Sequence, residues 1–360
     1  MRARTIAGLQ ILASLAMAGC ASIGPTTVAR DRFDYTEAVA ESWKSQMLLN
    51  LVKMRYGDAP VFLDVGQVVA GYSMQRTVSA TANALATQGF SPGATTGTLG
   101  LGAEGRFNDS PTITYTPLAG ENFARQMMTP IPPSAILSVI QAGLPLENVF
   151  RLGVQAINGV DNRRVRVDHV RPASPEFYVL LQDLGRLQNA GDIGARVDKD
   201  AQLTLVFRPS LSAVEESAVR DTAKILALDP TARQFRVVYG SVAADDKEIA
   251  LLTRSMVEVL EDLSSMITVP EAHVKERRVR PRPEVDLGPN GPVPPLVRIT
   301  SSVERPGDAF VAVPYRGYWF SIDDRDVASK HLLSSIMFLF TFVQTGAKDA
   351  APVLTIPATR

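Results

Sequence analysis

The amino-acid sequence predicts an α+β fold, with small mixed sheets packed against helices and one long extended β-hairpin at about 62–108. In several segments apolar residues recur at helical spacing, and in others they alternate with period two. The two kinds of segment are interspersed along the chain, and 46% of the residues are hydrophobic. This composition is sufficient for two or three hydrophobic cores of ordinary domain size.

Residues 1–19 have the three parts of a secretory signal peptide. Arg2 and Arg4 precede an apolar run that ends in small residues. The run is shorter than the roughly 20 apolar residues of a membrane-spanning helix. We therefore expect this segment to be removed after export.

Met17-Ala18-Gly19-Cys20 resembles the lipobox of bacterial lipoproteins, although leucine usually stands where this chain has Met17. The resemblance implies cleavage before Cys20, the chain's single cysteine, and attachment of palmitate-type acyl chains, which would form a stable membrane anchor. Ala21 stands where an inner-membrane retention signal would have aspartate. The resemblance thus implies the outer membrane of the cell, with the body in the periplasm or at the surface. The alternative is a free cysteine beside an ordinary signal peptide.

The overall charge gives no indication of a nucleic-acid partner. Loss of Arg2 and Arg4 takes Lys+Arg from 37 to 35, against 37 Asp+Glu. With no cysteine beyond Cys20, intramolecular disulfides are excluded, and stability must come from burial. The predicted partners are the bilayer, through acylated Cys20, and other envelope proteins or further copies of the chain.

The first part of the mature chain is predicted as a lipidated tether at 20–35 and a mixed region at 36–160. An amphipathic helix at 36–56 has Val39, Trp43 and Met47 at helical spacing. After the long hairpin come a strand at 111–117 and a helical subdomain with segments at 118–128, 134–142 and 146–157.

The long hairpin is the most unusual prediction. Strands average five or six residues, whereas the first alternating run covers 62–84 and a second follows at 99–108. One alternative is a hairpin in a soluble sheet, or a flap, which the many alanines and Arg76 on the apolar face favour. The other is a membrane hairpin that several copies donate to a shared β-barrel, as in multimeric lipoprotein secretion channels. The candidate membrane residues are Val68, Ala70, Tyr72, Met74, Val78, Leu99, Leu101 and Phe107.

The remaining chain is predicted as an α+β domain at 161–270, a basic, Pro-rich linker at 271–295 and a C-terminal unit at 296–360. The linker's arginines would contact anionic lipid or cell-wall groups, or simply face solvent. In the α+β domain we expect strands at 165–170, 202–208 and 235–239 and helices at 175–189, 212–228 and 246–267. In the C-terminal unit we expect a hairpin of 296–304 with 310–322, a helix at 325–345, and a last strand at 352–357 that completes its sheet.

The sequence contains one candidate binding surface. His169, His273 and His331 lie in separate segments without metal-ligand spacing, so we predict no metal and no cofactor. Two carboxylates beside aromatic rings suit acid/base work on a sugar or cation binding. Helix capping, with pairing to Arg316 and Arg325, is the alternative explanation. The surface comprises Tyr315, Arg316, Trp319, Asp323, Asp324 and Asp326.

These observations favour a membrane-anchored envelope lipoprotein that is not an enzyme and serves as a scaffold or assembly component of a cell-envelope complex. Beyond the lipobox, the chain resembles only uncharacterised envelope lipoproteins. The alternative is a subunit of a multimeric outer-membrane export pore to which each copy contributes the hairpin at 62–107. A third hypothesis is a cell-wall or polysaccharide hydrolase.

Overall fold

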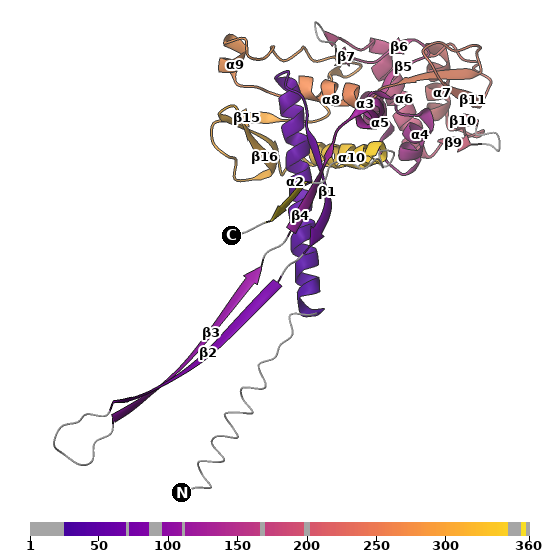
Figure 1. The fold of residues 1–360 in the computed structure, drawn as a ribbon. Helices are drawn as coiled ribbons and strands as arrows, with labels where there is room; N and C mark the ends of the chain where they lie inside the picture. Colours follow the sequence, from indigo (N-terminus) through magenta and orange to yellow (C-terminus); the bar gives the residue numbers. More distant parts are fainter. Residues whose placement is uncertain are drawn as a thin grey trace, which may run out of the picture. The chain divides into compact units, whose positions relative to one another are not determined.

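The computed structural model describes residues 25–69, 72–85, 96–109, 112–165, 170–197, 202–344 and 354–357. The predicted signal peptide, Cys20, Ala70 and His169 lie outside these residues. The described elements are helices and several small separate sheets (Figure 1), which confirms the predicted α+β class. Among these helices, none combines the length and apolar character needed to cross a membrane.

The chain divides into two compact units. The first comprises 1–39, 63–117 and 351–360, and the second comprises 40–62 and 118–350. Helix α2 (Pro25–Arg55) contributes to both, and Gly57 follows it with a left-handed φ of 79°. Because α2 begins at Pro25 and not at Thr36, residues 25–35 of the predicted tether are helical.

The first unit contains two separate sheets. In one, β1 (Phe62–Val69), β4 (Thr112–Leu118) and β18 (Leu354–Pro357) lie in the order β1-β4-β18. The other pairs β2 (Tyr72–Leu85) antiparallel with β3 (Thr96–Asp109). The hairpin therefore starts at Tyr72, not at 62. The prediction that the last strand completes the C-terminal sheet was wrong, because β18 pairs with β4. Alternation identifies a strand but not its partner.

The second unit is built around a six-stranded sheet of order β6-β5-β12-β11-β10-β9. Leu203, Leu205 and Phe207 of β10 are buried, whereas Thr204 and Val206 between them are half-buried, as one-sided packing requires. Helices α6 (Pro175–Ala190) and α7 (Ala213–Ile225) pack on each other and bury their apolar stripes in the same core. The strands are β5 (Val154–Ile157), β6 (Val160–Asp161), β9 (Ile193–Val197), β10 (Leu203–Phe207), β11 (Gln234–Tyr239) and β12 (Glu248–Thr253).

The predicted helix at 246–267 was wrong over its first half. Residues Glu248–Thr253 form strand β12, parallel to β11 and antiparallel to β5, and only Met256–Ser265 form helix α8. A strand buried on both faces is a continuous apolar run, which periodicity does not distinguish from a buried helix. Ser255 begins α8 with a capping box to Glu258.

A second core packs α8 against the C-terminal sheet of order β15-β17-β16 and helix α10 (Val327–Gln344). The segment predicted as one strand at 310–322 is divided into β16 (Ala309–Tyr315) and β17 (Tyr318–Asp323), which form a tight hairpin with each other. From the predicted first strand, β15 (Thr300–Ser302) pairs with β17, so the prediction of a direct hairpin across 305–308 was wrong. The turn residues Arg316 and Gly317 have φ of 47° and 85°, as a two-residue hairpin turn requires. A polar residue followed by glycine was the sequence signal for this turn, and it was missed.

The remaining elements include three helices beside these cores and the segment predicted as a linker. That segment contains α9 (Glu271–Lys275) and the short β13–β14 pair, and it buries His273, Val279 and Asp286. It is therefore packed and not simply solvated. The other elements are α3 (Glu121–Met128), α4 (Pro133–Gln141), α5 (Leu146–Gly153), β7 (Arg164–Val165), β8 (Val170–Arg171), β13 (Leu287–Gly288) and β14 (Gly291–Pro292).

Asn158, in the β5–β6 turn, provides a test of the six-stranded sheet. Its Nδ2 donates to the carbonyls of Leu226 (2.9 Å) and Glu248 (3.2 Å), its Oδ1 accepts from Ala250 N (2.7 Å), and its φ is 45°. We expect Asn158→Gly to lower the free energy of unfolding by about 1–3 kcal/mol through these lost hydrogen bonds. Asn158→Ala should cost about 1 kcal/mol more, because alanine is strained at positive φ. Urea denaturation of both variants measures this; an alanine variant as stable as the glycine variant contradicts it.

Candidate functional site

The structure places the predicted binding-surface residues at two ends of the β16–β17 hairpin. At the turn end, the Tyr315 hydroxyl donates to Asp58, and Arg316 Nη2 lies 3.0 Å from Asp58 Oδ2. Trp319 lies beneath the guanidinium of Arg305, 5.4 Å from the ring centre. Arg316 thus pairs with Asp58 and not with the carboxylates predicted from the sequence.

The three aspartates lie at the other end of β17, where α10 begins. Asp323 Oδ1 accepts from the backbone N–H of Arg325 at 2.7 Å. Asp324 pairs with Lys330 Nζ at 2.6 Å, and Asp326 accepts from the Ser329 hydroxyl at 2.8 Å. Each carboxylate therefore helps to shape the start of the helix, while Arg325 pairs with Asp308. The six residues do not form one site.

The candidate membrane residues fall on three strands. Val68 belongs to β1, and Ala70 lies outside the described residues; the other six belong to the β2–β3 hairpin. The register pairs Met74 with Phe107 and Val78 with Ala103, so the two alternating apolar sets identified in the sequence are partners.

The hairpin itself is a long, isolated ladder. Each strand has 14 residues, and the register runs without a shift from Tyr72↔Asp109 to Leu85↔Thr96. In the part of the chain that the structure describes, this sheet has only these two strands. Among the described residues, no further strand pairs with either of its edges.

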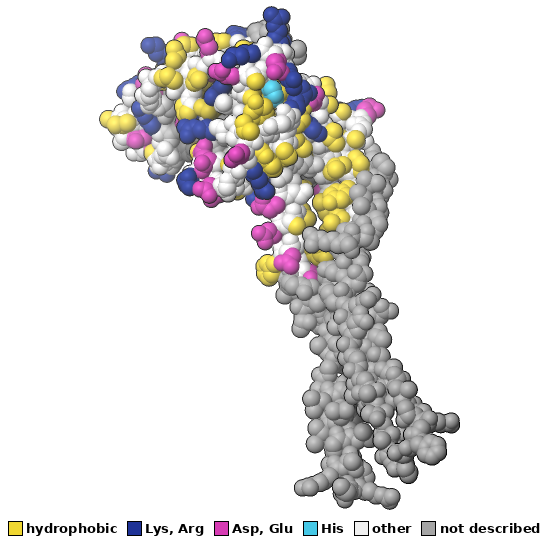
Figure 2. All heavy atoms as spheres, turned by 90° about the vertical axis from the view of Figure 1, so that its left-hand side faces the viewer, with side chains coloured by type: hydrophobic (Ala, Val, Ile, Leu, Met, Phe, Trp, Pro, Cys, Tyr) yellow, Lys and Arg dark blue, Asp and Glu magenta, His cyan; other side chains and the backbone are white. Residues whose placement is uncertain are grey.

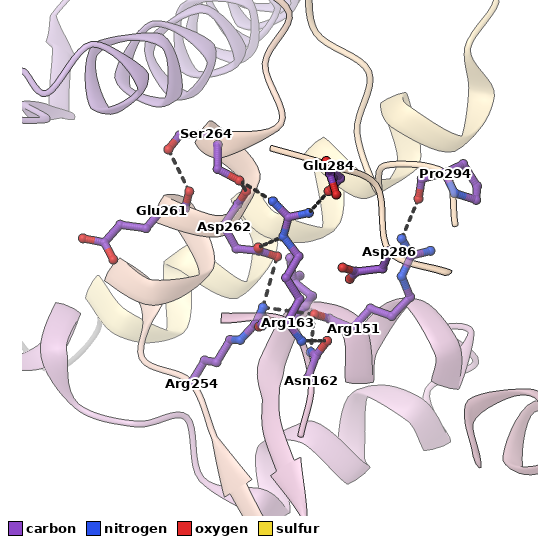
Figure 3. Close-up of polar contacts among 12 residues, drawn as sticks. Arg151, Asn162, Arg163, Arg254, Glu261, Asp262, Ser264, Glu284, Asp286 and Pro294 are labelled. Atoms are coloured by element: carbon purple, nitrogen blue, oxygen red, sulfur yellow. Dashed lines mark hydrogen bonds and ion pairs between the residues drawn. The ribbon is translucent and has the colours of Figure 1, made fainter. Parts of the chain in front are cut away.

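The most unusual chemistry of the second unit is a buried cluster of two arginines and one aspartate (Figure 3). Arg163, Arg254 and Asp262 are 6%, 3% and 8% exposed. Arg163 Nε lies 3.2 Å from Asp262 Oδ1, and Arg254 Nη1 lies 3.2 Å from Asp262 Oδ2. One carboxylate thus bridges two guanidiniums.

Backbone carbonyls and a hydroxyl satisfy the remaining N–H groups of this cluster. Arg254 donates to the carbonyls of Arg151 (3.1 Å) and Arg163, and Arg163 donates to Ser265 Oγ (3.1 Å) and to the Glu284 carbonyl (3.4 Å). Such hydrogen bonds are what a buried charge needs if it is to be tolerated. The segments joined are the end of α5, the residues after β6 and β12, α8 and the 271–295 segment.

A small cavity of about 30 Å³ adjoins the cluster, lined in part by Arg163, Tyr178 and Asp286. The Tyr178 hydroxyl donates to Asp286 Oδ2 at 2.7 Å, and burial, followed by this hydrogen bond, raises the pKa of Tyr178. A cavity of this size holds one or two waters, not a substrate. The arrangement is suited to holding segments together, and its carboxylates are committed to cations or hydroxyls.

The described histidines do not form a ligand set. His273 is buried, with its Nδ1 2.7 Å from the Tyr56 hydroxyl, and His331 lies exposed on α10. Within the described ranges, no group of three or more His, Cys, Asp or Glu side chains could hold a metal ion. No family model, curated protein or solved structure matches this chain.

The first test of the site is a substitution of Asp262. Asp262→Asn keeps the shape of the side chain but leaves two buried guanidiniums without a counter-charge, so we expect a loss of about 3–5 kcal/mol in the free energy of unfolding. The matched control is Asp308→Asn, which breaks the exposed pair with Arg325 and should cost less than about 1 kcal/mol. Equal losses in urea denaturation would show that the buried cluster does not stabilise the second unit.

The second test measures how the contribution of Glu248 to stability depends on pH. The backbone N–H of Ala244, followed by the Arg236 guanidinium, lowers the pKa of Glu248 below its ordinary 4.5. The stabilisation is therefore complete above about pH 4.5 and is lost as the pH falls towards the folded-state pKa. We expect the difference in stability between wild type and Glu248→Gln to shrink on acidification, as measured by urea denaturation from pH 7 to 3. Glu304→Gln, at an exposed position, is the control; a constant difference for Glu248→Gln contradicts the assignment.

Proposed function

We propose that this chain is a lipid-anchored, non-enzymatic assembly component of a cell-envelope complex, and that the β2–β3 hairpin is its assembly element. The observation that carries the proposal is the 14-residue ladder, neither edge of which pairs with a further strand among the described residues. An isolated two-stranded hairpin is at best marginally stable in water, and long open edges are templates for another strand. A partner that supplies further strands resolves both problems.

The compact second unit supports the same proposal. Its buried Arg163–Asp262–Arg254 cluster joins segments from separate parts of the chain, and the adjoining cavity has room only for water. Basic and acidic side chains are interspersed on the face seen in Figure 2, where no extended basic surface suited to nucleic acid is visible. In the proposed arrangement, acylated Cys20 anchors the chain in the outer membrane and the body occupies the periplasm.

A second candidate function is a subunit of a multimeric export pore. The observation that favours it is the strand length: 14 residues extend to about 45 Å, whereas about 30 Å of hydrocarbon must be crossed. In this variant the partner strands come from further copies of the chain, and the hairpin enters the membrane.

Replacing residues 72–109 by a short Gly-Ser turn tests the assembly role. The variant is expressed with its native signal and extracted from cells in detergent. We expect light scattering to show monomers in place of larger particles, because the strand edges used for pairing are gone. Cys20→Ser, which retains the hairpin, should instead lose palmitate incorporation and membrane association. Unchanged particle size after the hairpin deletion contradicts the assembly proposal.

A cysteine scan distinguishes the two candidate functions. Single cysteines at positions 72–85, in a Cys20→Ala background with a separate membrane anchor, are treated with a membrane-impermeant maleimide. If the strand at 72–85 enters the membrane, labelling should alternate with period two along it, since one face of such a strand meets lipid. A lipid-soluble maleimide then separates the two cases: it labels the protected positions if they face lipid, whereas positions buried against a periplasmic partner are labelled by neither reagent. A cysteine at Val242, which is 79% exposed in the second unit, is the accessible control.

A further inference from the structure

The second unit contains an apolar cavity that the assembly role does not use. It has a volume of about 140 Å³ and lies among α4, α5, α8 and α10, which are labelled in Figure 1. Protein interiors rarely contain voids larger than a water molecule. An apolar cavity of roughly 150 Å³ remains dry and binds a small apolar molecule.

The cavity lies where the two hydrophobic cores meet. Ile136 and Val149 belong to the core of the six-stranded sheet, whereas Val259 and Ile336 belong to the core around α10. One face of α10 closes the cavity, with residues at helical spacing from Ala328 to Leu339. The two hydrophobic cores adjoin here without filling the cavity. A ligand could therefore enter the cavity without disrupting either core.

The lining defines the chemical class of the ligand. It is aliphatic, and no Phe, Tyr or Trp is among the lining residues. The polar lining side chains are Asn148, His331 and Ser335. Asn148 and His331 are exposed, which places polar groups where the cavity meets solvent, and the Ser335 hydroxyl already donates to the His331 carbonyl at 2.8 Å.

We propose that this cavity binds the aliphatic chain of an amphiphile, with about six terminal carbons of the acyl tail enclosed among α4, α5, α8 and α10, the carbons next to the head in the mouth of the cavity, and the polar head beside Asn148 and His331. The apolar lining excludes a charged or strongly hydrated ligand from the interior, since burying such groups without partners is costly. A neutral or protonated imidazole at the mouth can donate to a carboxylate or phosphodiester oxygen. A free fatty acid and a membrane lipid share this chemistry, and the proposal does not depend on the assembly role.

The test uses the full-length chain with Cys20→Ser, which keeps every described residue and removes the acyl chains expected on Cys20, so that no covalently attached lipid competes for the cavity. Isothermal titration calorimetry and thermal unfolding are measured with decanoate and, separately, with decanoyl-lysophosphatidylcholine below its micellar concentration. Binding to the folded state should raise the unfolding temperature with ligand concentration. Binding of decanoate alone identifies a free fatty acid as the ligand, and binding of both identifies a membrane lipid as well. If neither binds, the proposal is overturned.

Matched variants localise the binding. Val139→Trp places a large side chain in the cavity lining and should weaken decanoate binding at least about tenfold. Val214→Trp, at a position 62% exposed on α7, should leave it unchanged. Equal affinity in both variants overturns the proposed location.

The exposed His331 keeps the proposal testable if Val139→Trp does not fold. His331→Ala should weaken decanoate binding about threefold to tenfold while leaving 1-decanol binding unchanged, because only the carboxylate head is affected. Equal weakening for both ligands, or no weakening for either, overturns the proposed placement of the head.

Discussion

The second unit depends on a single carboxylate shared between two arginines. Asp262 comes from α8, Arg254 from the residue after the central strand β12, and Arg163 from the chain after β6. The helical core around α8 and the core of the six-stranded sheet are thereby fixed to each other through one charge. The carbonyls of Arg151 and Glu284 extend the same cluster to α5 and to the segment at 271–295. A different relative position of the two cores would leave at least one buried guanidinium without its partners.

This arrangement also explains why a charged interior need not indicate catalysis. Buried titratable groups are often functional, but here each carboxylate has a committed cation or hydroxyl and the adjoining cavity has room only for water. The apolar cavity, which lies a short distance along α8, differs from the charged cluster because it has space for a ligand but no charged side chain in its lining. The buried charged cluster and the apolar cavity are therefore separate.

Local sequence pattern predicted most of the individual elements, because strong periodicity reflects one-sided burial. The segments at 175–189, 202–208 and 235–239 were confirmed as α6, β10 and β11. Strand β12 was missed because it is buried on both faces, and strand partners were assigned wrongly because pairing is a property of the whole fold. The buried cluster could not be predicted for the same reason: Arg163, Arg254 and Asp262 are brought together by topology. The one local signal was Arg254, a lone cation that ends the apolar run of β12.

The pairing of β18 with β4 imposes an order of events on the maturing chain. Residues 354–357 must reach β4, yet most of the second unit, residues 118–350, lies between them in sequence. During synthesis, amino-terminal segments fold first, so β1 and β4 emerge long before their third strand exists. In that interval one edge of β4 stays unprotected, and an open strand edge invites pairing with other chains. The edge of β4 is covered only when the carboxyl-terminal strand β18 pairs with it. The β2–β3 hairpin therefore emerges well before the first unit, which contains it, is complete.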